Sequence, residues 1–449
     1  MTFLLKMSIK NYVSSGDKMA PGFFKTNMST GYLRNPSRNT EHKRPEAAFY
    51  NIAGTAFMDD GLYIEAGNQF IIKEYKNSIP DSPFPGFPAG SYNDETFVYL
   101  YPNADIVYKH DKWAVFANFG IYAGGGKLEY SEGTSATTLA FASSALNYKT
   151  QAETIYATNP TDPRVPIYST SAANLLKAAN DHSLTVTSIT YGWQAGGAFA
   201  VTDWLSLGAA FRLTYGTQKL ELTSSHFTLV GNGGNEISYN ASAVGFSGVF
   251  GIHAKPIDGL DLAGQFAWRS KMNYELSDKK GNLINQFITG NEFRTDLAPV
   301  LNLGVGYRII DPLYVSTSFN YYFNNLAEMN SVLGKTDYNN SFEIALGTDY
   351  DIAKAVTASL GVAYGHQGIT DTSNSVFNPV LDSFQVGAGV EVRPIELLTI
   401  TGGATWVNYF SHDYYISGAG KSVKTELSKP PSGHVLHRSN IPPSHIIFY

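Results

Sequence analysis

The sequence predicts an all-β fold, a transmembrane antiparallel β-barrel, and three observations lead to it. Charged residues make up only 16% of the 449 residues, whereas soluble domains carry about 25%. Aromatic residues reach 14%, and there are 42 glycines. No stretch approaches the roughly 18 consecutive apolar residues of a membrane helix. Low charge without an apolar run is typical of a barrel, in which lipid-facing and lumen-facing residues alternate.

Alternation of apolar and polar residues marks the strands. From Leu301 to Ile309 every odd position is apolar or aromatic and every even position is polar or glycine, and the same phase resumes at Leu313 after Asp311-Pro312. Two alternating runs joined by a tight turn predict a β-hairpin. Similar runs flank five further turns, at Asp111-Lys112, Thr202-Asp203, Pro256 to Gly259, Asp351 to Lys354 and Arg393-Pro394.

The strand count follows from these turns. Six hairpins supply twelve strands, and an opening strand at Leu62 to Ile72 and a closing strand after Trp406 bring the total to about fourteen. This number is even, as bacterial single-chain barrels require. The short turns alternate with long polar segments at 124–184, 218–240, 270–297, 325–340 and 366–382. Short periplasmic turns and long outer loops are the outer-membrane pattern, which we prefer to a soluble β-sandwich or propeller.

One face of the hairpins is polar, and we expect it to line a lumen while the apolar face meets lipid. Its charged or amide members are Arg212, Gln265, Arg269, Arg308, Glu343, Asp349, Gln385 and Glu391.

The two ends of the chain depart from the strand pattern. Residues 1–28 form a leader in which the apolar patch is too short for a recognisable signal peptide. Residues 29–58 are small, polar and rich in Asn, Pro and Arg, so they are either a disordered leader or a plug within the lumen. We therefore assign 59–427 to the barrel. Residues 428–449 contain Pro430, Pro431, Pro442 and Pro443 without alternation, which predicts an irregular tail.

The residues of the plug-like segment resemble a known family. The run Gly31-Tyr32-Leu33-Arg34-Asn35-Pro36-Ser37-Arg38-Asn39, then Phe49 to Ala56, Gly61-Leu62 and Gly67 to Phe70, is similar to the FadL/TodX-type outer-membrane transport family, and closest to its Bacteroidetes-like branch. Tyr108-Lys109, Asp111 to Ala114 and Gly124 to Lys127 match as well, so that the resemblance extends from about Gly31 to Lys421.

The resemblance implies a fourteen-stranded barrel in the outer membrane of a Gram-negative bacterium, plugged by an N-terminal hatch. Such proteins move hydrophobic compounds, such as long-chain fatty acids or aromatic hydrocarbons. Asn51, Ile52 and Ala53 match the family's Asn-Pro-Ala motif except that Ile52 replaces proline, and Ile leaves φ free where Pro fixes it. The hatch residues implied are Arg34, Asn35, Pro36, Arg38, Tyr50, Asn51, Ile52, Ala53 and Gly54.

The family also kinks its third strand inward to open a lateral gap. Here the matching strand begins at Trp113 and contains Gly120, Gly124, Gly125 and Gly126. Glycine suits a sharp strand bend, although these glycines are equally consistent with the start of a long loop.

Ligand-binding candidates lie in two loops and on the lumen face. Phe84 and Phe87, in 76–102, and Leu175 and Leu176, in 124–184, offer apolar side chains for an outer capture surface, or for packing of one loop on another. Arg212 and Arg308, together with Arg34 and Arg38 of the hatch, could bind a fatty-acid carboxylate. Alternatively, these arginines pair with Glu65, Glu343, Asp349 or Glu391.

Catalytic and cofactor motifs are not found, so we expect no enzyme, no cofactor and no metal site. His253 and His366 are more readily explained as solvated residues than as ligands, and the adjacent Ser225 and His226 are weak evidence for an enzyme. The net charge of −6 disfavours nucleic acid. The expected partners are hydrophobic small molecules and outer-membrane lipid, with the protein a monomer. An open diffusion porin for small polar solutes is the alternative, but a porin needs no N-terminal hatch.

Overall fold

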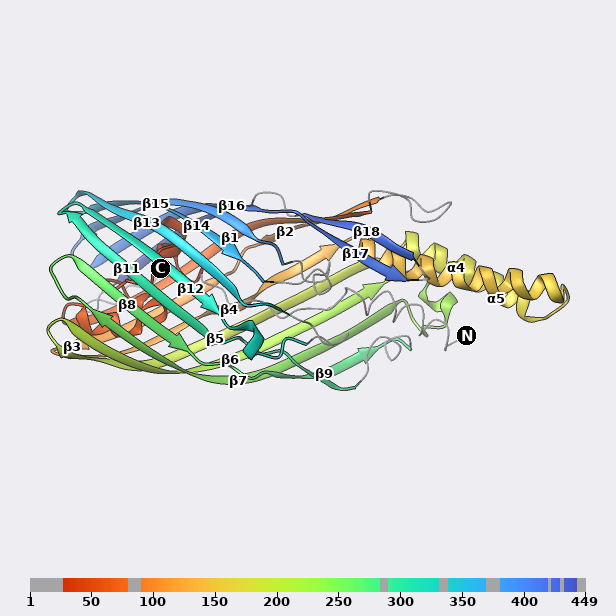
Figure 1. Ribbon diagram of the computed structural model, residues 1–449, viewed down its shortest axis with the longest axis horizontal. Helices are drawn as coiled ribbons and strands as arrows, with labels where there is room; N and C mark the ends of the chain where they lie inside the picture. Colours follow the sequence, from red (N-terminus) through yellow and green to blue (C-terminus); the bar gives the residue numbers. More distant parts are fainter. Residues whose placement is uncertain are drawn as a thin grey trace.

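The computed structural model describes residues 27–79, 90–282, 290–330, 338–368, 380–418, 421–428 and 432–441. All named strands belong to one 19-stranded sheet, which closes into a long barrel (Figure 1). In chain order the strands are β1 (Gly61–Ile79), β2 (Gly90–Val98), β3 (Pro102–His110), β4 (Trp113–Tyr130), β5 (Ser183–Thr202), β6 (Leu205–Thr223), β7 (Glu236–Ala254), β8 (Leu260–Ala267), β9 (Asn273–Lys280), β10 (Glu292–Arg294), β11 (Val300–Ile310), β12 (Leu313–Tyr322), β13 (Ser341–Ala353), β14 (Val356–His366), β15 (Ser383–Ile395), β16 (Leu398–Tyr409), β17 (His412–Gly418), β18 (Lys421–Ser428) and β19 (Ser432–Ile441).

The ring has fourteen strand positions in the part of the chain that is described, as predicted. Five positions are each occupied by two successive strands: β2 with β3 beside β1, β8 with β9 beside β7, β10 with β11 beside β9 and β8, β16 with β17, and β18 with β19. The ladder between β17 and β18 continues the one between β16 and β19, and β18, like β19, pairs with β1. The ring closes because β19 pairs with β16 on one side and β1 on the other.

The C-terminal segment requires a correction, because β19 occupies 432–441 of the tail that was expected to be irregular. A strand between two others gains backbone hydrogen bonds on both edges whether or not its side chains alternate. Pro430 and Pro431 precede β19 and Pro442 and Pro443 follow it, so no proline interrupts its ladder.

Short turns join consecutive strands at one end of the barrel (Figure 1). Four of them lie at, or within one residue of, the predicted positions, and a fifth, predicted at Asp351 to Lys354, lies at Lys354-Ala355 because β13 continues to Ala353. The sixth is displaced from Arg393-Pro394 to Glu396-Leu397. The ladder between β15 and β16 shifts register between Val392 and Ile395, and this irregular stretch accommodates a proline that has no N–H to donate.

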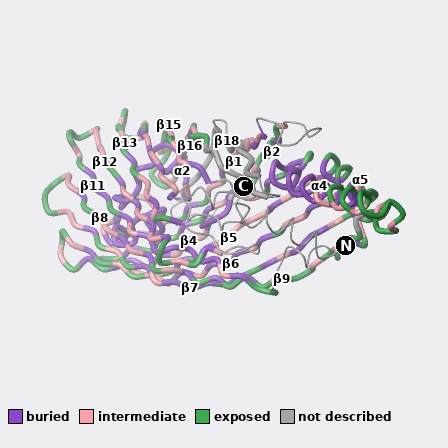
Figure 2. Tube along the Cα trace, turned by 45° about the vertical axis from the view of Figure 1, so that its right-hand side comes forward, coloured by how far each residue is buried: buried purple, intermediate pink, exposed green. Residues whose placement is uncertain are grey.

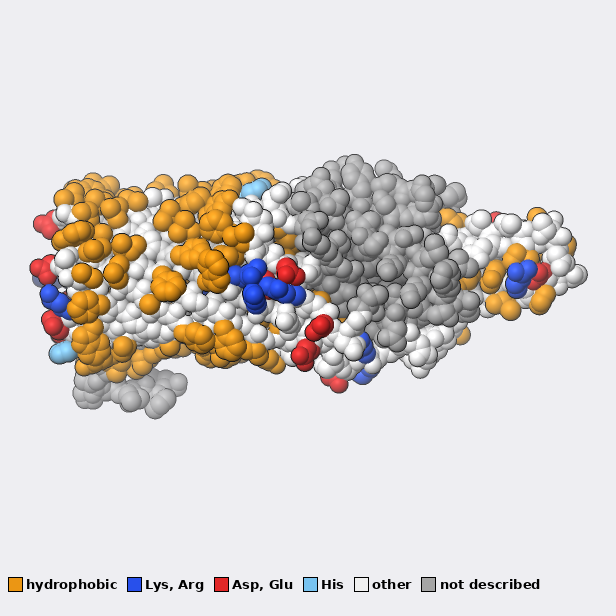
Figure 3. Space-filling view, turned by 60° about the horizontal axis from the view of Figure 1, so that its bottom comes forward, with side chains coloured by type: hydrophobic (Ala, Val, Ile, Leu, Met, Phe, Trp, Pro, Cys, Tyr) orange, Lys and Arg blue, Asp and Glu red, His pale blue; other side chains and the backbone are white. Residues whose placement is uncertain are grey.

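The apolar face of the strands points outward, as predicted. On β6, Leu207 is 48% exposed while the neighbouring Ser206 is fully buried. Figure 3 shows hydrophobic side chains over the barrel wall, bounded by charged side chains at the short-turn rim. An exposed apolar surface of this extent is stable in contact with lipid.

Two helices form a hairpin at the opposite, outer end, α4 (Ser135–Thr158) and α5 (Arg164–Asn180) (Figure 1). They replace most of the long loop expected at 124–184, because β4 continues to Tyr130 and β5 begins at Ser183. Thr134 and Thr137 form a reciprocal capping box that fixes the start of α4. Among the described residues no helix is long and apolar enough to cross a membrane.

The predicted plug is folded inside the barrel rather than disordered. Its helices are α2 (Thr30–Arg34), α3 (Ala47–Tyr50) and the 3-10 helix η1 (Ile52–Phe57), and nearly all of its residues are buried. They lie within the short-turn half of the barrel (Figures 1 and 2). We call residues 29–58 the hatch from here on.

Candidate functional site

Glycines on the inner face of the strands make room for the hatch. A Cβ atom at Gly347 would lie 1.7 Å from Asn35 Oδ1, one at Gly361 2.6 Å from Pro36 Cδ, and one at Gly387 2.3 Å from the Leu33 carbonyl oxygen. Distances under about 3 Å exclude a side chain at these positions. The absent side chains therefore allow the hatch backbone to lie against the wall. The alternation in the sequence places small residues on this face, but nothing in it marks them as the contact area of the hatch.

Buried ion pairs hold the first half of the hatch. Arg34 lies 3.2 Å from Glu391 and 3.5 Å from Asp349. Arg38 pairs with Glu46 at 2.5 Å and also with Glu41. Buried charges require such partners, so the structural alternative raised for Arg34 and Arg38 is the arrangement observed. Arg44, which no sequence motif pointed to, also pairs with Glu391.

Hydrogen bonds hold the second half. Asn51 accepts a bond from Gly54 N at 3.2 Å and donates to the Glu41 carbonyl at 3.0 Å. Ile52 N donates to Gln265 Oε1 at 3.0 Å, and Ser206 Oγ donates to the Ala53 carbonyl at 2.7 Å. The predicted motif residues thus contact β6 and β8 directly. Tyr50 completes the segment, because its hydroxyl accepts a bond from Met28 N at 2.9 Å.

Arg212 and Arg308 occupy different places. Arg212 on β6 is buried in the middle of the lumen, where it donates to Gln194 at 2.8 and 3.0 Å. Its guanidinium lies 4.8 Å from the ring centre of Tyr122 and 5.9 Å from that of Phe49 in the hatch. Arg308 instead lies near the short turns, 3.6 Å from Asp351. Only Arg212 is placed between the hatch and the outer half of the lumen.

The strand ladder changes at the predicted lateral opening. β3 pairs with β4 only as far as Phe119, and no ladder joins the rest of β4 to β2 in the described residues. Side chains bridge this interval instead, with Tyr101 Oη donating to the Ile121 carbonyl at 3.1 Å and Glu129 N donating to Asp94 at 2.6 Å.

The glycines of β4 lie in this interval. The ladder from β4 to β5 shifts register twice between Ile121 and Gly126. Gly124 and Gly126 have φ values of +90° and +80°, which favour glycine. A Cβ at Gly120 would meet Met28 Cε at 2.1 Å, so the strand also lies close to the start of the hatch.

Of the four outer loop candidates, Leu175 and Leu176 lie among the described residues, on α5. Phe84 and Phe87 lie outside the described residues. Leu175 is buried among apolar residues of α4 and the outer barrel, whereas Leu176 is exposed. Leu175 therefore packs within the structure, as in the loop-packing alternative. Of the two, only Leu176 is exposed to a ligand arriving from outside.

His253 corrects the expectation of a solvated histidine, because it is fully buried between the hatch and the wall. Its Nε2 atom lies 3.0 Å from Asp261 Oδ1. His366 is partly exposed beside Asp382. His42 of the hatch is buried near His253, and burial lowers the pKa of its imidazole to about 3 although Asp261 opposes this shift.

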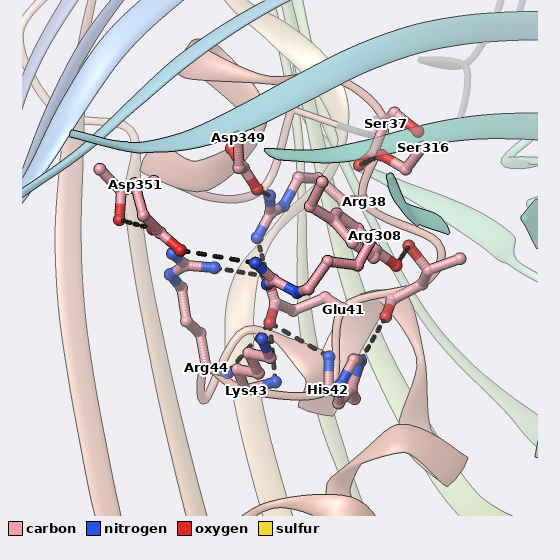
Figure 4. A pocket seen from close by; sticks show the side chains of 13 residues that line it. Ser37, Arg38, Glu41, His42, Lys43, Arg44, Arg308, Ser316, Asp349 and Asp351 are labelled. Atoms are coloured by element: carbon pink, nitrogen blue, oxygen red, sulfur yellow. Dashed lines mark hydrogen bonds and ion pairs between the residues drawn. The ribbon is translucent and has the colours of Figure 1, made fainter. Parts of the chain in front are cut away.

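A cavity of about 70 Å³ opens between the hatch and the strands near the short turns (Figure 4). The residues that line it are polar or charged, with both signs of charge among them. The lining residues include Arg38, His42, Lys43, Arg308, Asp349 and Asp351.

Comparison with known proteins agrees with this architecture. Residues 103–411 match the sequence model of the family described as outer membrane protein transport protein (OMPP1/FadL/TodX). No curated protein matches. The chain resembles the crystal structure of a Pseudomonas aeruginosa FadL homologue, with 14% identity, a TM-score of 0.66 and coverage of 94% of this chain and 100% of that one. It also resembles the Pseudomonas putida toluene transporter TodX, with 15% identity, a TM-score of 0.58 and coverage of 90% and 95%. The Ralstonia pickettii toluene transporter TbuX shares 13% identity at a TM-score of 0.52, with coverage of 89% and 94%.

Proposed function

The chain belongs to the OMPP1/FadL/TodX family of outer membrane transport proteins, and from this premise we propose that it admits hydrophobic compounds such as long-chain fatty acids or monoaromatic hydrocarbons. Uptake is passive. The ligand enters from the outer end, displaces the hatch and leaves sideways through the wall.

The apolar outer half of the lumen carries this proposal. Buried side chains from the helical hairpin meet those of the surrounding strands there, among them Leu139, Phe141, Tyr148, Leu175, Leu128, Tyr130, Leu184, Leu222, Ile237, Tyr239 and Tyr274. A porin for polar solutes needs a water-filled, polar lumen. An apolar outer lumen above a seated hatch suits a hydrophobic ligand better than an open pore.

Arg212 is our candidate for recognising a carboxylate. It lies where the apolar outer half meets the hatch, within reach of Phe49 and Tyr122. A charge-assisted bond to a carboxylate would draw the guanidinium away from these rings. Phe49 belongs to the hatch, so ligand binding at Arg212 would favour a displaced hatch over the seated one. An aromatic hydrocarbon has no carboxylate and would depend on the apolar surface alone.

Lateral release is proposed at β4. The interval from Gly120 to Gly126 combines a missing ladder on one side with two register shifts on the other. Few backbone hydrogen bonds would have to break for a ligand to pass from the lumen into lipid there. Gly125 lies within the same interval.

A disulfide between hatch and wall tests the proposal. Ser37 Oγ of the hatch lies 3.1 Å from Ser318 Oγ on β12, so cysteine sulfurs at these two positions lie close enough to bond, and the chain has no other cysteine. In cells expressing Ser37→Cys/Ser318→Cys, oxidation should abolish uptake of a labelled long-chain fatty acid, and reduction should restore it. Each single variant is the matched control.

If uptake continues after mass spectrometry has verified the crosslink, the proposal that the hatch moves during transport is wrong. Steady, large conductance steps from the wild-type protein in a planar bilayer would instead favour the porin alternative.

A further inference from the structure

Three potential metal ligands meet where the hatch touches the barrel wall. His42 belongs to the hatch, His253 to β7 and Asp261 to β8. His253 Nε2 lies 3.0 Å from Asp261 Oδ1, and His42 Nδ1 lies 3.6 Å from the same oxygen. One ligand atom from each residue lies within 4.8 Å of the other two, and all three residues are buried. In the described residues this is the only group of its kind.

We propose that His42, His253 and Asp261 bind a divalent transition-metal ion, with Zn²⁺ as the reference case, and that the ion ties the hatch to the wall. Two imidazoles and a carboxylate are a ligand set that such ions favour. Around tetrahedral zinc, ligand atoms about 2.1 Å from the ion lie about 3.4 Å apart. The two observed distances bracket this value, so small side-chain movements bring the three ligands around one ion. His42 Nδ1 also lies 3.0 Å from the Thr40 carbonyl oxygen, so it gives up that bond and the ring carries its proton on Nε2 when Nδ1 binds the ion.

The surroundings of the cluster orient it. Tyr314 Oη donates to the second oxygen of Asp261 at 2.9 Å, which leaves the first oxygen facing both imidazoles. Support of this kind for a ligating carboxylate is usual at metal sites. The cavity near the short turns is lined by Thr40, His42 and Tyr314 among others, and it offers space beside the cluster for the remaining water ligands of an ion (Figure 4).

Asn51 couples the site to the hatch. Its Nδ2 lies 2.6 Å from His253 Nδ1, while its Oδ1 accepts the bond from Gly54 N. Without an ion, His253 carries its proton on Nε2, which faces Asp261. When an ion binds to Nε2, the neutral His253 ring carries its proton on Nδ1 instead. That N–H needs an acceptor, which the Asn51 amide supplies by turning its oxygen toward His253. Metal binding thereby removes the cap of η1 and rearranges the Asn51-Ile52-Ala53 segment.

Metal binding to the purified protein tests the site without reference to transport. The full chain, prepared without a polyhistidine tag, is titrated with Zn²⁺ alone, and with Co²⁺ for its visible absorption spectrum. We expect one ion per chain, and at least a tenfold loss of affinity in His253→Gln and Asp261→Asn. His110→Gln is the matched control, because His110 also faces a carboxylate, Asp60 at 3.6 Å, but is exposed on the rim. Its affinity should equal that of the wild type.

Wild-type protein that retains no stoichiometric ion would overturn the proposal, and so would equal affinity in the wild type and the triad variants. Where a wall variant fails to fold, which the heat-dependent gel mobility of barrels reports, His42→Ala on the hatch decides the same question. The effect of the ion on transport rests on the proposed function and is measured separately. Zn²⁺ should slow fatty-acid uptake in the wild type and not in His42→Ala. A bound ion without this effect contradicts the tie to the hatch and leaves the site standing.

Discussion

At the scale of single residues, Ile52 shows how a departure from a family motif is accommodated. Its N–H donates to Gln265 Oε1, and the Gln265 amide in turn donates to the Phe49 carbonyl at 2.9 Å. Proline at this position would fix φ but could not donate. Isoleucine at position 52 therefore leaves the backbone less restricted than proline would, but it allows a hydrogen bond between the hatch and the wall. This bond offsets the loss of rigidity that the sequence predicts.

Ile52→Pro tests this exchange. Loss of the N–H leaves a buried amide oxygen of Gln265 without its donor, at a cost of about 1–3 kcal/mol. We expect faster hydrogen exchange of hatch amides in Ile52→Pro. Ile52→Val keeps the N–H and should change exchange much less. Equal exchange in the two variants would show that the bond to Gln265 contributes nothing.

His182 is a second residue with a role of its own, because its burial makes the stability of the helical hairpin depend on pH. It is buried under the start of α4, with Nδ1 2.9 Å from the Ala178 carbonyl and Nε2 2.7 Å from Thr137 Oγ1. Burial lowers the pKa of its imidazole to about 4, against the pull of nearby acceptors and Asp181. The unfolded hairpin, with a pKa near 6.5, binds the proton more readily than the folded one. Stability from His182 is therefore complete above about pH 6.5 and is lost as the pH falls toward 4.

Hydrogen exchange of α4 amides should accordingly accelerate between pH 7 and pH 4.5, after correction for intrinsic rates. In His182→Gln, which does not titrate, the corrected rates should stay nearly constant over this range. The same acceleration in both proteins would assign it to other groups.

At the scale of elements, the inner-face glycines explain how strands and hatch fit together. β13, β14 and β15 each place a glycine where the hatch backbone approaches, at Gly347, Gly361 and Gly387. Gly248 on β7 differs, because the nearest atom to a Cβ there is 3.5 Å away on its own neighbour Phe250. The two kinds of glycine look alike in the sequence.

Gly347→Ala and Gly248→Ala separate the two kinds. The first introduces a collision with Asn35 and should destabilise the seated hatch by about 1–3 kcal/mol, measured as protease cleavage within residues 29–58. The second adds a methyl group in ordinary contact and should leave hatch cleavage unchanged. Similar cleavage in both variants would mean that the wall adjusts freely at Gly347.

At the scale of the whole molecule, the exposed apolar side chains and the buried polar ones divide the barrel into a lipid face and a lumen. The lumen is itself divided, with ion pairs and hydrogen bonds around the hatch and apolar packing in the outer half. The hatch engages the inward carboxylates Asp349 and Glu391. Arg212 and Arg308 have partners on the wall itself, Gln194 and Asp351.

Arginine substitutions should report depth in the membrane. Phe211 lies well inside β6, whereas Leu207 lies three residues from the turn at Trp204, and both are exposed. Phe211→Arg should cost about 2–4 kcal/mol in urea unfolding from lipid vesicles, and Leu207→Arg should cost about 0–1 kcal/mol. A reversed order would contradict the placement of the lipid band.

The sequence by itself determined most of the strands, most of the turns, the number of positions in the ring and which face meets lipid, whereas β2, β9 and β10 lie in segments that it indicated as loops. These features follow from local rules: period-two alternation, turn residues and the absence of a long apolar run. Only the tertiary structure decided that Arg34 pairs with Asp349 and Glu391, that Gly347 gives room to Asn35, and that His42 meets His253 and Asp261. These partners are about 200 to 360 positions apart in the chain. Strand β19 is likewise decided by the tertiary structure. It pairs with β16 and β1 because the ring closes there, and not because of its own side-chain pattern. Contacts between distant residues depend on how the barrel closes around the hatch, and no pattern of neighbouring residues encodes that.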